Sequence, residues 1–281
     1  MLIDSHKIKK LIGPFIITLG CLLFTLNVLA QDIADQKTLD KKTPERALPE
    51  FHAKYNIQFY GINSAEAHYR LSYTDTGYQF TQKTNLIGLA SLFADDSISA
   101  VSIVDEIDNK LLLKKHSYIQ TGKKKDRDEH INIDWDTSKN PAKAKITGTV
   151  RGDKINLESD TAIWEALSFQ LPLMLEARPG KKDYPYKALL KGEIETYNFV
   201  LTSSKKISFA YKEYDALQMV RTDPHKDRQL HIWLLPELHN IPVIIENYRK
   251  GKVHSRVQLK SVQFNDEKPY LDNLTDDDDE F

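Results

Sequence analysis

The sequence predicts a mainly β protein, built as an antiparallel, strongly curved sheet or partly open β-barrel with one packed amphipathic helix. Apolar and polar residues alternate over most of residues 51–265, with turn residues between the runs. One segment, residues 160–171, follows a helical period instead. A composition of 41% hydrophobic and 10% aromatic residues suits a globular body with a buried interior. No repeat of fixed period is present, which argues against a propeller or solenoid.

The first 30 residues predict an export signal. Three lysines precede residue 11, residues 11–26 carry no charge, and Val28-Leu29-Ala30 has the small-residue spacing that signal peptidase reads. We therefore expect cleavage after Ala30 and a mature chain in the periplasm, or otherwise exported, in a bacterium. An uncleaved transmembrane anchor is the alternative, because residues 11–30 reach the length that a bilayer requires.

The single cysteine, Cys21, lies inside this segment. Gly20-Cys21 resembles the end of a lipobox, so a lipoprotein modified at Cys21 is a second alternative. The residues after Cys21 stay apolar, however, where a lipoprotein normally becomes polar, and this favours cleavage after Ala30. Such cleavage removes the only thiol, so no disulfide and no cysteine nucleophile is expected in the mature chain.

The remaining chain is predicted to hold one domain between two polar ends. Residues 31–50 combine charged residues with two prolines and no periodicity, which indicates a polar linker. Residues 266–281 predict an acidic disordered tail, because the acidic run at 276–280 repels itself. Residues 51–265 form the predicted β domain, in which no apolar run is long enough to give a transmembrane helix.

The strands of the first half are expected from strict alternation. Every odd position of residues 51–59 is apolar, and after Gly61 the same pattern returns in residues 65–73. Such alternation places one set of side chains on one face of a sheet. With the turn at Asp75-Thr76-Gly77, it predicts two antiparallel hairpins. The pattern continues over residues 131–135 and 146–150.

Further strands are expected in the second half, where Arg249-Lys250-Gly251-Lys252 reads as a tight hairpin connection. The alternation there predicts strands at residues 197–202, 207–211, 217–221, 230–235, 241–248 and 253–264.

Residues 160–171 predict the helix, with Asp160 as its N-cap and an apolar stripe along one side. Pro172 disturbs the helix, which can resume over residues 173–176. Core packing is the expected role of Trp164 and Phe169, since large apolar residues are mostly buried.

The sequence predicts no catalytic residue, no cofactor and no metal site. It lacks a glycine-rich phosphate loop and a Gly-x-Ser-x-Gly elbow. His225, His231, His239 and His254 match no short metal-binding spacing. Residues 123–128 predict a solvated, charged hairpin tip whose lysines could touch acidic lipid headgroups. A net charge of -1 gives no general basic field, so nucleic acid is not an expected partner.

Three places in the sequence carry a resemblance to a known family. They are Phe51-x-x-x-Tyr55-x-Ile57-x-Phe59-Tyr60-Gly61, Asp160 followed by Leu167-Ser168-Phe169, and His231-Ile232-Trp233-Leu234 with Ile241-Pro242-Val243-Ile244-Ile245 and Lys250-Gly251. In these elements the chain resembles the DUF3108 family of exported bacterial proteins of unknown function. The resemblance implies an envelope location and a β fold, and it implies no reaction.

We therefore expect a non-catalytic exported protein that binds a lipid or another apolar envelope component, or aids envelope assembly. The residues expected to line its interior, as cavity wall or core, are Tyr55, Phe59, Trp164, Phe169 and Trp233. An envelope interaction module that pairs through exposed strand edges is the alternative, and a periplasmic hydrolase has the least support. The oligomeric state does not follow from the sequence.

Overall fold

The computed structural model describes residues 46–88, 90–91, 96–108, 110–222, 227–265 and 267–271. They belong to the second of two units of the chain, which begins at Arg46. The predicted export signal with Cys21, most of the predicted linker, His225 and residues 272–281 of the predicted tail lie outside the described residues.

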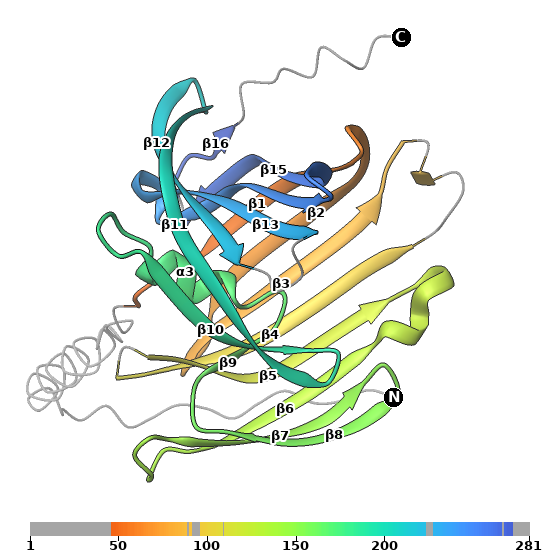
Figure 1. Ribbon diagram of the computed structural model, residues 1–281, viewed down its shortest axis with the longest axis vertical. Coiled ribbons are helices and arrows are strands. Elements are labelled where there is room, and N and C mark those ends of the chain that lie inside the picture. The colour runs from red at the N-terminus through yellow and green to blue at the C-terminus, as the bar shows by residue number, and fades with distance from the viewer. Residues whose placement is uncertain are drawn as a thin grey trace, which may run out of the picture. The chain divides into compact units, whose positions relative to one another are not determined.

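One 16-stranded sheet forms the described unit (Figure 1). Its strands follow chain order in both directions away from the pair of β1 (Phe51–Phe59) and β15 (Lys252–Phe264), which joins the two ends of the domain sequence. The first flank continues from β1 through β2 (Ile62–Tyr73), β3 (Gly77–Leu86), β4 (Ser97–Ile107), β5 (Lys110–Gln120), β6 (Glu129–Asp136), β7 (Lys143–Val150) and β8 (Asp153–Ser159).

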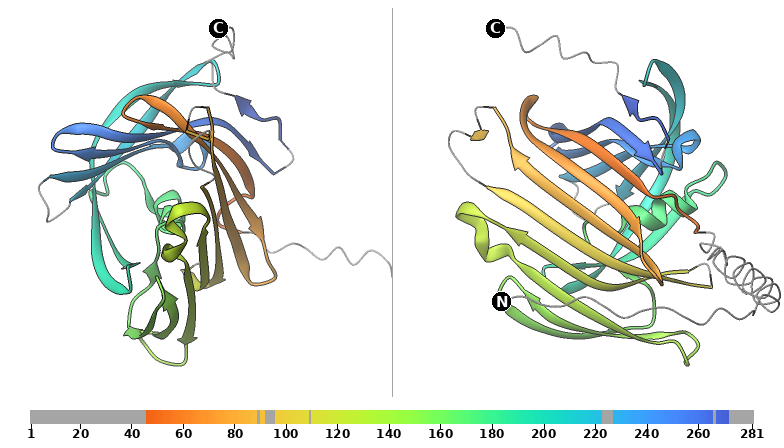
Figure 2. Two further views of the ribbon diagram at one scale, coloured as in Figure 1. Left: turned by 90° about the vertical axis from the view of Figure 1, so that its right-hand side faces the viewer. Right: turned by 180° about the vertical axis from the view of Figure 1, so that it is seen from behind.

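The second flank continues from β15 in the reverse direction along the chain. It holds β14 (Ile241–Arg249), β13 (Arg228–Leu235), β12 (Lys212–Thr222), β11 (Glu193–Phe209), β10 (Asp183–Leu190) and β9 (Ile163–Trp164), while β16 (Tyr270–Leu271) pairs with β15 off this path. The sheet curls into a nearly closed barrel whose single seam lies between its two end strands, β8 and β9 (Figure 2).

The predicted mainly β, strongly curved fold is confirmed, with one addition. Neighbouring strands run antiparallel throughout the described sheet except β9 and β10, which pair in parallel at Ile163↔Lys187 and Trp164↔Ala188. The short β9 also packs against β5 of the other flank. The segment that starts the second flank therefore crosses the inside of the barrel instead of closing the seam with ladder hydrogen bonds.

The predicted helix at 160–171 is wrong in position, because residues 163–164 form β9 and α3 spans Gln170–Glu176. Asp160 is exposed in the β8–β9 connection and caps no helix. The apolar period instead belongs to a buried turn, in which the Glu165 carboxylate accepts the backbone N–H groups of Leu167 and Ser168 at 2.6 and 2.8 Å. Pro172 is accommodated as the third residue of α3, where the amide has no intrahelical partner.

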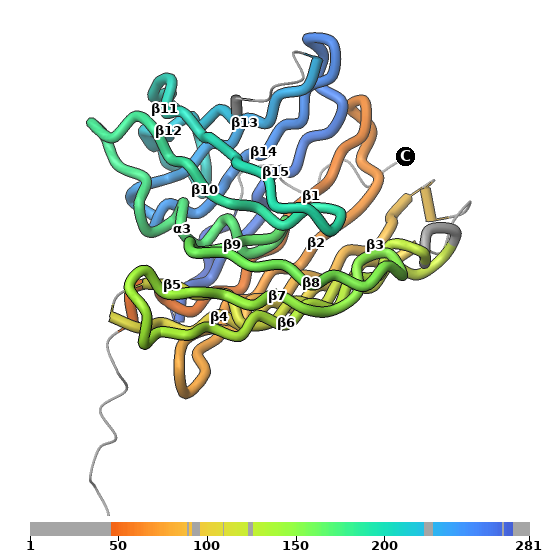
Figure 3. The backbone as a smooth tube through the Cα atoms, turned by 60° about the horizontal axis from the view of Figure 1, so that its bottom comes forward, coloured from red at the N-terminus to blue at the C-terminus, as the bar shows by residue number. Residues whose placement is uncertain are grey.

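Helix α3 is also more buried than an amphipathic surface helix. Five of its seven residues, Gln170 to Met174, are buried. The helix lies between the β10–β14 side and the β4–β8 side of the curled sheet (Figure 3). It thus fills part of the interior, which agrees with the expectation that the sheet wraps around one helix. No helix within the described residues combines the length and the apolar character needed to cross a membrane.

Several strands differ from the expectation. The predicted strands at 197–202 and 207–211 are one 17-residue strand, β11, whose pairing with β12 shifts register between Leu201 and Ser203. Residues 202–206 are polar and exposed, so the sequence pattern predicts a break between two strands there. The strands β5, β8 and β10 were not predicted, although the alternation over 51–59 matches β1 to the residue.

The connections between strands alternate between two ends of the barrel, because neighbouring strands on each flank run antiparallel. We call one of them the open end. It holds the β1–β2, β7–β8, β10–β11, β12–β13 and β14–β15 connections, together with the 3-10 helix η1 (Gly122–Arg127) between β5 and β6. The connections β6–β7 and β11–β12 lie at the opposite end, as does the 3-10 helix η2 (Pro236–Leu238) between β13 and β14.

Candidate functional site

A cavity of about 970 Å³ occupies the barrel interior toward the open end. Its walls come from both flanks of the sheet: β4, β5 and β6 on one side and β10 to β15 on the other. The turn that follows β9 supplies the base of the cavity through Glu165, Ala166 and Leu167. The site is therefore assembled only when the two flanks curl toward each other.

The cavity carries an excess of positive charge. Among the described residues, six arginines and lysines line it against three glutamates: Arg127, Arg151, Lys191, Arg221, Arg228 and Arg249 against Glu129, Glu165 and Glu195. The whole chain has a net charge of only -1. Basic side chains are thus concentrated at the cavity, and a concave site with low-dielectric walls focuses the field of such a cluster.

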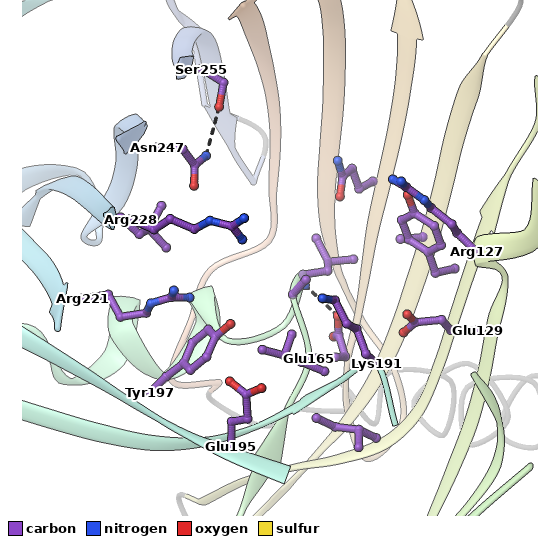
Figure 4. Close-up of a pocket in the computed structure, with 18 of the residues that line it drawn as sticks. Arg127, Glu129, Glu165, Lys191, Glu195, Tyr197, Arg221, Arg228, Asn247 and Ser255 are labelled. Atoms are coloured by element: carbon purple, nitrogen blue, oxygen red, sulfur yellow. Dashed lines mark hydrogen bonds between the residues drawn. The ribbon is translucent and has the colours of Figure 1, made fainter. Parts of the chain in front are cut away.

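The basic residues reach the cavity from opposite sides. Arg221 and Arg228 extend into it from the β12–β13 side, while Arg127 and Glu129 face them from the β5–β6 side (Figure 4). Lys191 lies between the two groups in the same view. An anion held near the centre would therefore meet cations on several sides.

Local turn chemistry explains the position of one of these cations. Lys191 and Gly192 connect β10 and β11 as a two-residue turn with φ of 52° and 86°. A turn of this kind needs left-handed φ at both central positions, so glycine at the second position relieves strain and the first carries the basic side chain. Lys191 directly follows the end of β10, and this position places its side chain at the mouth of the cavity.

Most of these cations form no ion pair within the described part of the chain. Arg127, Arg151, Lys191, Arg228 and Arg249 form no ion pair with any residue that the structure describes. The sixth, Arg221, places its guanidinium over the Tyr197 ring at 4.1 Å from the centroid. Because the cations outnumber the glutamates, they repel one another, and a bound anion would reduce that repulsion.

Apolar side chains make up the rest of the wall. The cavity is also lined by Phe59, Leu167, Leu189, Leu190 and Leu230. Leu167 is 3% exposed and Leu189 is 2% exposed, so the inner part of the wall belongs to the hydrophobic core. The site therefore combines cations at its mouth with an inner surface that is partly apolar and partly polar.

A buried polar cluster closes the base of the cavity. Ser102 of β4 donates its hydroxyl to Glu165 Oε1 at 2.6 Å, and Ser102 Oγ lies 3.0 Å from His116 Nδ1. Because a serine hydroxyl has one proton, its donation to Glu165 makes His116 Nδ1–H the donor to Ser102. His116 Nδ1 also lies 3.4 Å from Glu165 Oε2.

This cluster does not have the order of a nucleophilic relay. In such a relay the histidine lies between the serine and the carboxylate and takes the serine proton. Here the serine donates directly to the carboxylate, and Ser102 is 0% exposed. The cluster links the turn after β9 to strands β4 and β5 through buried polar contacts.

Burial raises the pKa of two lining residues. Desolvation raises the pKa of Glu129, against the opposing effects of His116 and Arg151. Desolvation likewise raises the pKa of Tyr248 to about 12, and its hydrogen bond to the Glu246 carboxylate adds to this rise. Tyr248 is therefore a neutral hydrogen-bond donor at physiological pH.

The five residues expected to line the interior divide between wall and core. Phe59 lines the cavity. Tyr55, Trp164, Phe169 and Trp233 pack in the hydrophobic core or against it. Tyr55 donates its hydroxyl to Pro242 O at 2.9 Å, and Phe169 stacks on Phe199 with centroids 5.6 Å apart.

The sequence interpretation did not identify the basic residues of the site. The sequence placed Arg127 in a solvated loop, Arg249 in a hairpin connection and Arg221 in a strand, and it predicted a binding role for none of the six. Arg151-Gly152 and Lys191-Gly192 were visible as turn dipeptides, but only a closed sheet shows that both turns border one cavity. Within the described ranges, no group of three or more His, Cys, Asp or Glu residues could hold a metal ion.

Comparisons with known proteins identify a family and a fold. The family described as "Protein of unknown function (DUF3108)" matches residues 54–254. A β-barrel-like protein of the DUF1849 family from Brucella abortus matches with a TM-score of 0.51 and 11% identity, covering 79% of this chain and all of that chain. A candidate lipoprotein from Parabacteroides distasonis has a TM-score of 0.27 and 10% identity over 78% of this chain and 97% of that chain. No curated protein matches the sequence.

Proposed function

Because the chain belongs to the DUF3108 family, whose description assigns no function, we propose a function from the cavity itself. The protein is an exported, non-catalytic binding protein that takes an anionic amphiphile, such as an acidic lipid of the cell envelope, into its barrel. Capture or transfer of such a lipid is the means by which it aids envelope assembly. The pattern of residues 1–30 supports export.

The observation that carries the proposal is the set of five lining cations that form no ion pair with a described residue, beside a partly apolar inner wall. Arginine binds phosphate and carboxylate groups through two parallel N–H donors, which makes it the preferred residue for such headgroups. Arg127 and Arg228 face the cavity from opposite sides, so an anionic headgroup in the cavity would lie between two cations. The apolar wall then receives the hydrocarbon part of the ligand.

The size of the cavity fits this ligand class. At about 970 Å³ it lies at the upper end of ligand pockets, which span about 300–1,000 Å³. A uniformly apolar molecule would leave the lining cations without a partner in a confined site. The sequence predicts a lipid or another apolar component as the ligand. The lining cations restrict this ligand class to molecules with a negative charge.

A binding assay with lysolipids below their micelle concentration tests this function. We expect the full chain to bind lysophosphatidylglycerol at least about tenfold more tightly than lysophosphatidylcholine of equal chain length, since charged hydrogen bonds contribute about 1.5–3 kcal/mol each. The double variant Arg127→Gln, Arg228→Gln should remove this preference. Arg70→Gln, which changes an exposed arginine of β2, is the matched control and should leave it intact. Equal affinity for both headgroups would refute the proposal.

A second candidate rests on the seam. Among the described strands β8 pairs only with β7, so one of its edges is open to strand addition. Crosslinking from Asn156 of β8 in intact cells, with Asn132 of β6 as the control position, tests it. A defined partner recovered only from Asn156, together with an absence of lysolipid binding, would favour an interaction module over a lipid-binding protein.

A further inference from the structure

Exposed apolar side chains gather at one turn of the open end. Phe59, Tyr60 and Ile62 are 43%, 74% and 65% exposed, and they lie within four residues of the β1–β2 connection. We call residues 59–62 the apolar turn. The other large exposed apolar residues of the described chain are dispersed: Ile107, Ile119, Tyr211 and Leu271. A cluster of this kind on a surface marks an interaction site, whereas single exposed residues need no explanation.

Basic residues continue the rim directly from the apolar turn. Phe59 is paired with Ser255 of β15, and Tyr60 N–H donates to His254 O at 3.1 Å. On the next strands Lys252 pairs with Arg249, and Arg249 pairs with Arg228. We call the set Arg228, Arg249, Lys250 and Lys252 the basic rim. Asp227, whose carbonyl accepts the N–H of Lys250, is the acidic residue of this stretch.

We propose that the open end docks on an anionic lipid surface, with the apolar turn inserted at the headgroup boundary and the basic rim on the acidic headgroups. Aromatic and branched apolar side chains partition into this boundary, and tyrosine places its hydroxyl toward water there. Each basic side chain near such a surface strengthens binding about fivefold. This docking goes beyond ligand binding in the cavity and does not depend on it.

The geometry places the mouth of the cavity at the docked surface. Phe59, Arg228 and Arg249 belong both to the docking rim and to the cavity wall. A lipid could therefore pass between bilayer and cavity without crossing water. A second copy of the chain is the poorer occupant, because a symmetric contact would bring the basic rim of one copy against that of the other.

Site-specific labelling tests the docking in the full chain. The variants Tyr60→Cys and Tyr211→Cys, each with Cys21→Ser, carry an environment-sensitive NBD fluorophore. Tyr211 is 78% exposed at the β11–β12 turn of the opposite end, so it is a matched control. With phosphatidylglycerol vesicles we expect a blue shift and quenching by doxyl-labelled lipid at position 60 and neither at position 211. This local readout is independent of any membrane affinity of residues 1–45.

Charge reversal tests the second half of the proposal. The pair Lys250→Glu, Lys252→Glu should lower the vesicle affinity reported at position 60 about tenfold or more, given the contribution of each basic residue. The control pair Lys139→Glu, Lys143→Glu makes the same charge change at the β6–β7 connection of the opposite end. This pair should lower the vesicle affinity reported at position 60 by a smaller factor. Far-ultraviolet circular dichroism of each variant confirms that the sheet is retained.

Four results would overturn the docking proposal, three of them in the experiments with vesicles. These three are equal responses at positions 60 and 211, no response at position 60 in a folded chain, and equal loss in the two charge-reversal pairs. A blue shift at position 60 that grows with protein concentration without vesicles would also overturn it, by identifying the turn as a contact between copies. Lysolipid binding in the cavity is measured without vesicles, so failure of docking and failure of the proposed function are separate results.

Discussion

The hydroxyl of Ser102 lies 2.6 Å from the carboxylate of Glu165, although the two residues are 63 positions apart in the chain. Ser102 belongs to β4 on the first flank of the sheet, and Glu165 follows β9 at the start of the second. Since β8 and β9 form no ladder with each other, this hydrogen bond is one of the links between the flanks. It holds the turn that forms the base of the cavity.

Removal of the Glu165 side chain should destabilise the protein strongly. Glu165 is 2% exposed and accepts hydrogen bonds from Ser102, Leu167 and Ser168. Glu165→Ala leaves these buried donors without an acceptor, so we expect a loss of about 3–5 kcal/mol in the free energy of unfolding. Urea denaturation measures it. Glu195→Ala, which removes an exposed cavity carboxylate, should change it by less than about 0.5 kcal/mol.

The Glu129→Gln variant should be more stable than the natural chain at pH 8. Burial raises the folded-state pKa of Glu129 above its unfolded value, so folding takes up a proton between the two values. The stabilising effect of the protonated carboxyl is present below the unfolded pKa and is lost as pH rises through the folded pKa. Glutamine does not ionise, so the variant keeps its stability as pH rises through the folded-state pKa of Glu129.

The pH dependence of the difference is the diagnostic measurement. Thermal unfolding of both chains should show an advantage for Glu129→Gln at pH 8 that shrinks toward pH 4. A variant that is less stable than the natural chain at pH 8 would show that pairing with Arg151 and His116, rather than desolvation, dominates the energetics of Glu129.

Trp164→Ala should lower stability by about 3–5 kcal/mol, the usual cost of truncating a buried aromatic residue. Trp164 is 3% exposed within the core and pairs β9 with β10 at Ala188. Chemical denaturation gives the comparison with Ile62→Ala, whose side chain is 65% exposed and whose loss should change the free energy of unfolding far less. Similar values for the two variants would contradict the core assignment of Trp164.

Gly148→Ala should disrupt the pairing of β6 and β7. Gly148 has φ of 144°, and an added Cβ would lie 1.9 Å from the carbonyl oxygen of His130 on the neighbouring strand. Because that atom belongs to the backbone, the strands must separate, and we expect a loss above about 3 kcal/mol. Gly152→Ala is the control. Its Cβ would meet no atom within 4 Å, so only the left-handed φ is strained, at about 1–2 kcal/mol. The melting temperatures of both variants compare the cost of the backbone clash at residue 148 with the cost of the left-handed φ at residue 152.

Cleavage after Ala30 is checked by the mass of the chain recovered from cells. We expect an N-terminus at Gln31 and a product without Cys21. A product that retains residues 1–30 would support the membrane anchor, and one that begins at Cys21 with an added lipid mass would support the lipoprotein alternative.

The sequence by itself determined the strands whose two faces differ in environment. Alternation over residues 51–59 matches β1 because its odd residues 51, 53 and 55 are buried while His52 is exposed. It did not show β11 as one strand, because the residues at 202–206 are exposed on both faces. A period in sequence appears only where packing distinguishes one side of a strand from the other.

The helix shows a second limit of local pattern. Apolar residues at 163–171 have a helical period, yet Ile163 and Trp164 enter the sheet and the Glu165 carboxylate holds the turn after them. The partners that decide this, Ser102 and His116, are about 50 to 60 residues away in the sequence. The helix propensity of residues 163–171 depends on local sequence, so it does not include hydrogen bonds to residues this far away in the chain.

The candidate site belongs entirely to the tertiary structure. The sequence predicted an export signal and a mainly β domain, while the basic residues of the site lie in separate segments of the chain. Only the closure of the sheet through the β1–β15 pair brought Arg127 and Arg228 to opposite sides of one cavity. Charges on distant strands add to a common field only when the backbone places them around the same space, and that placement is decided by strand order and curvature.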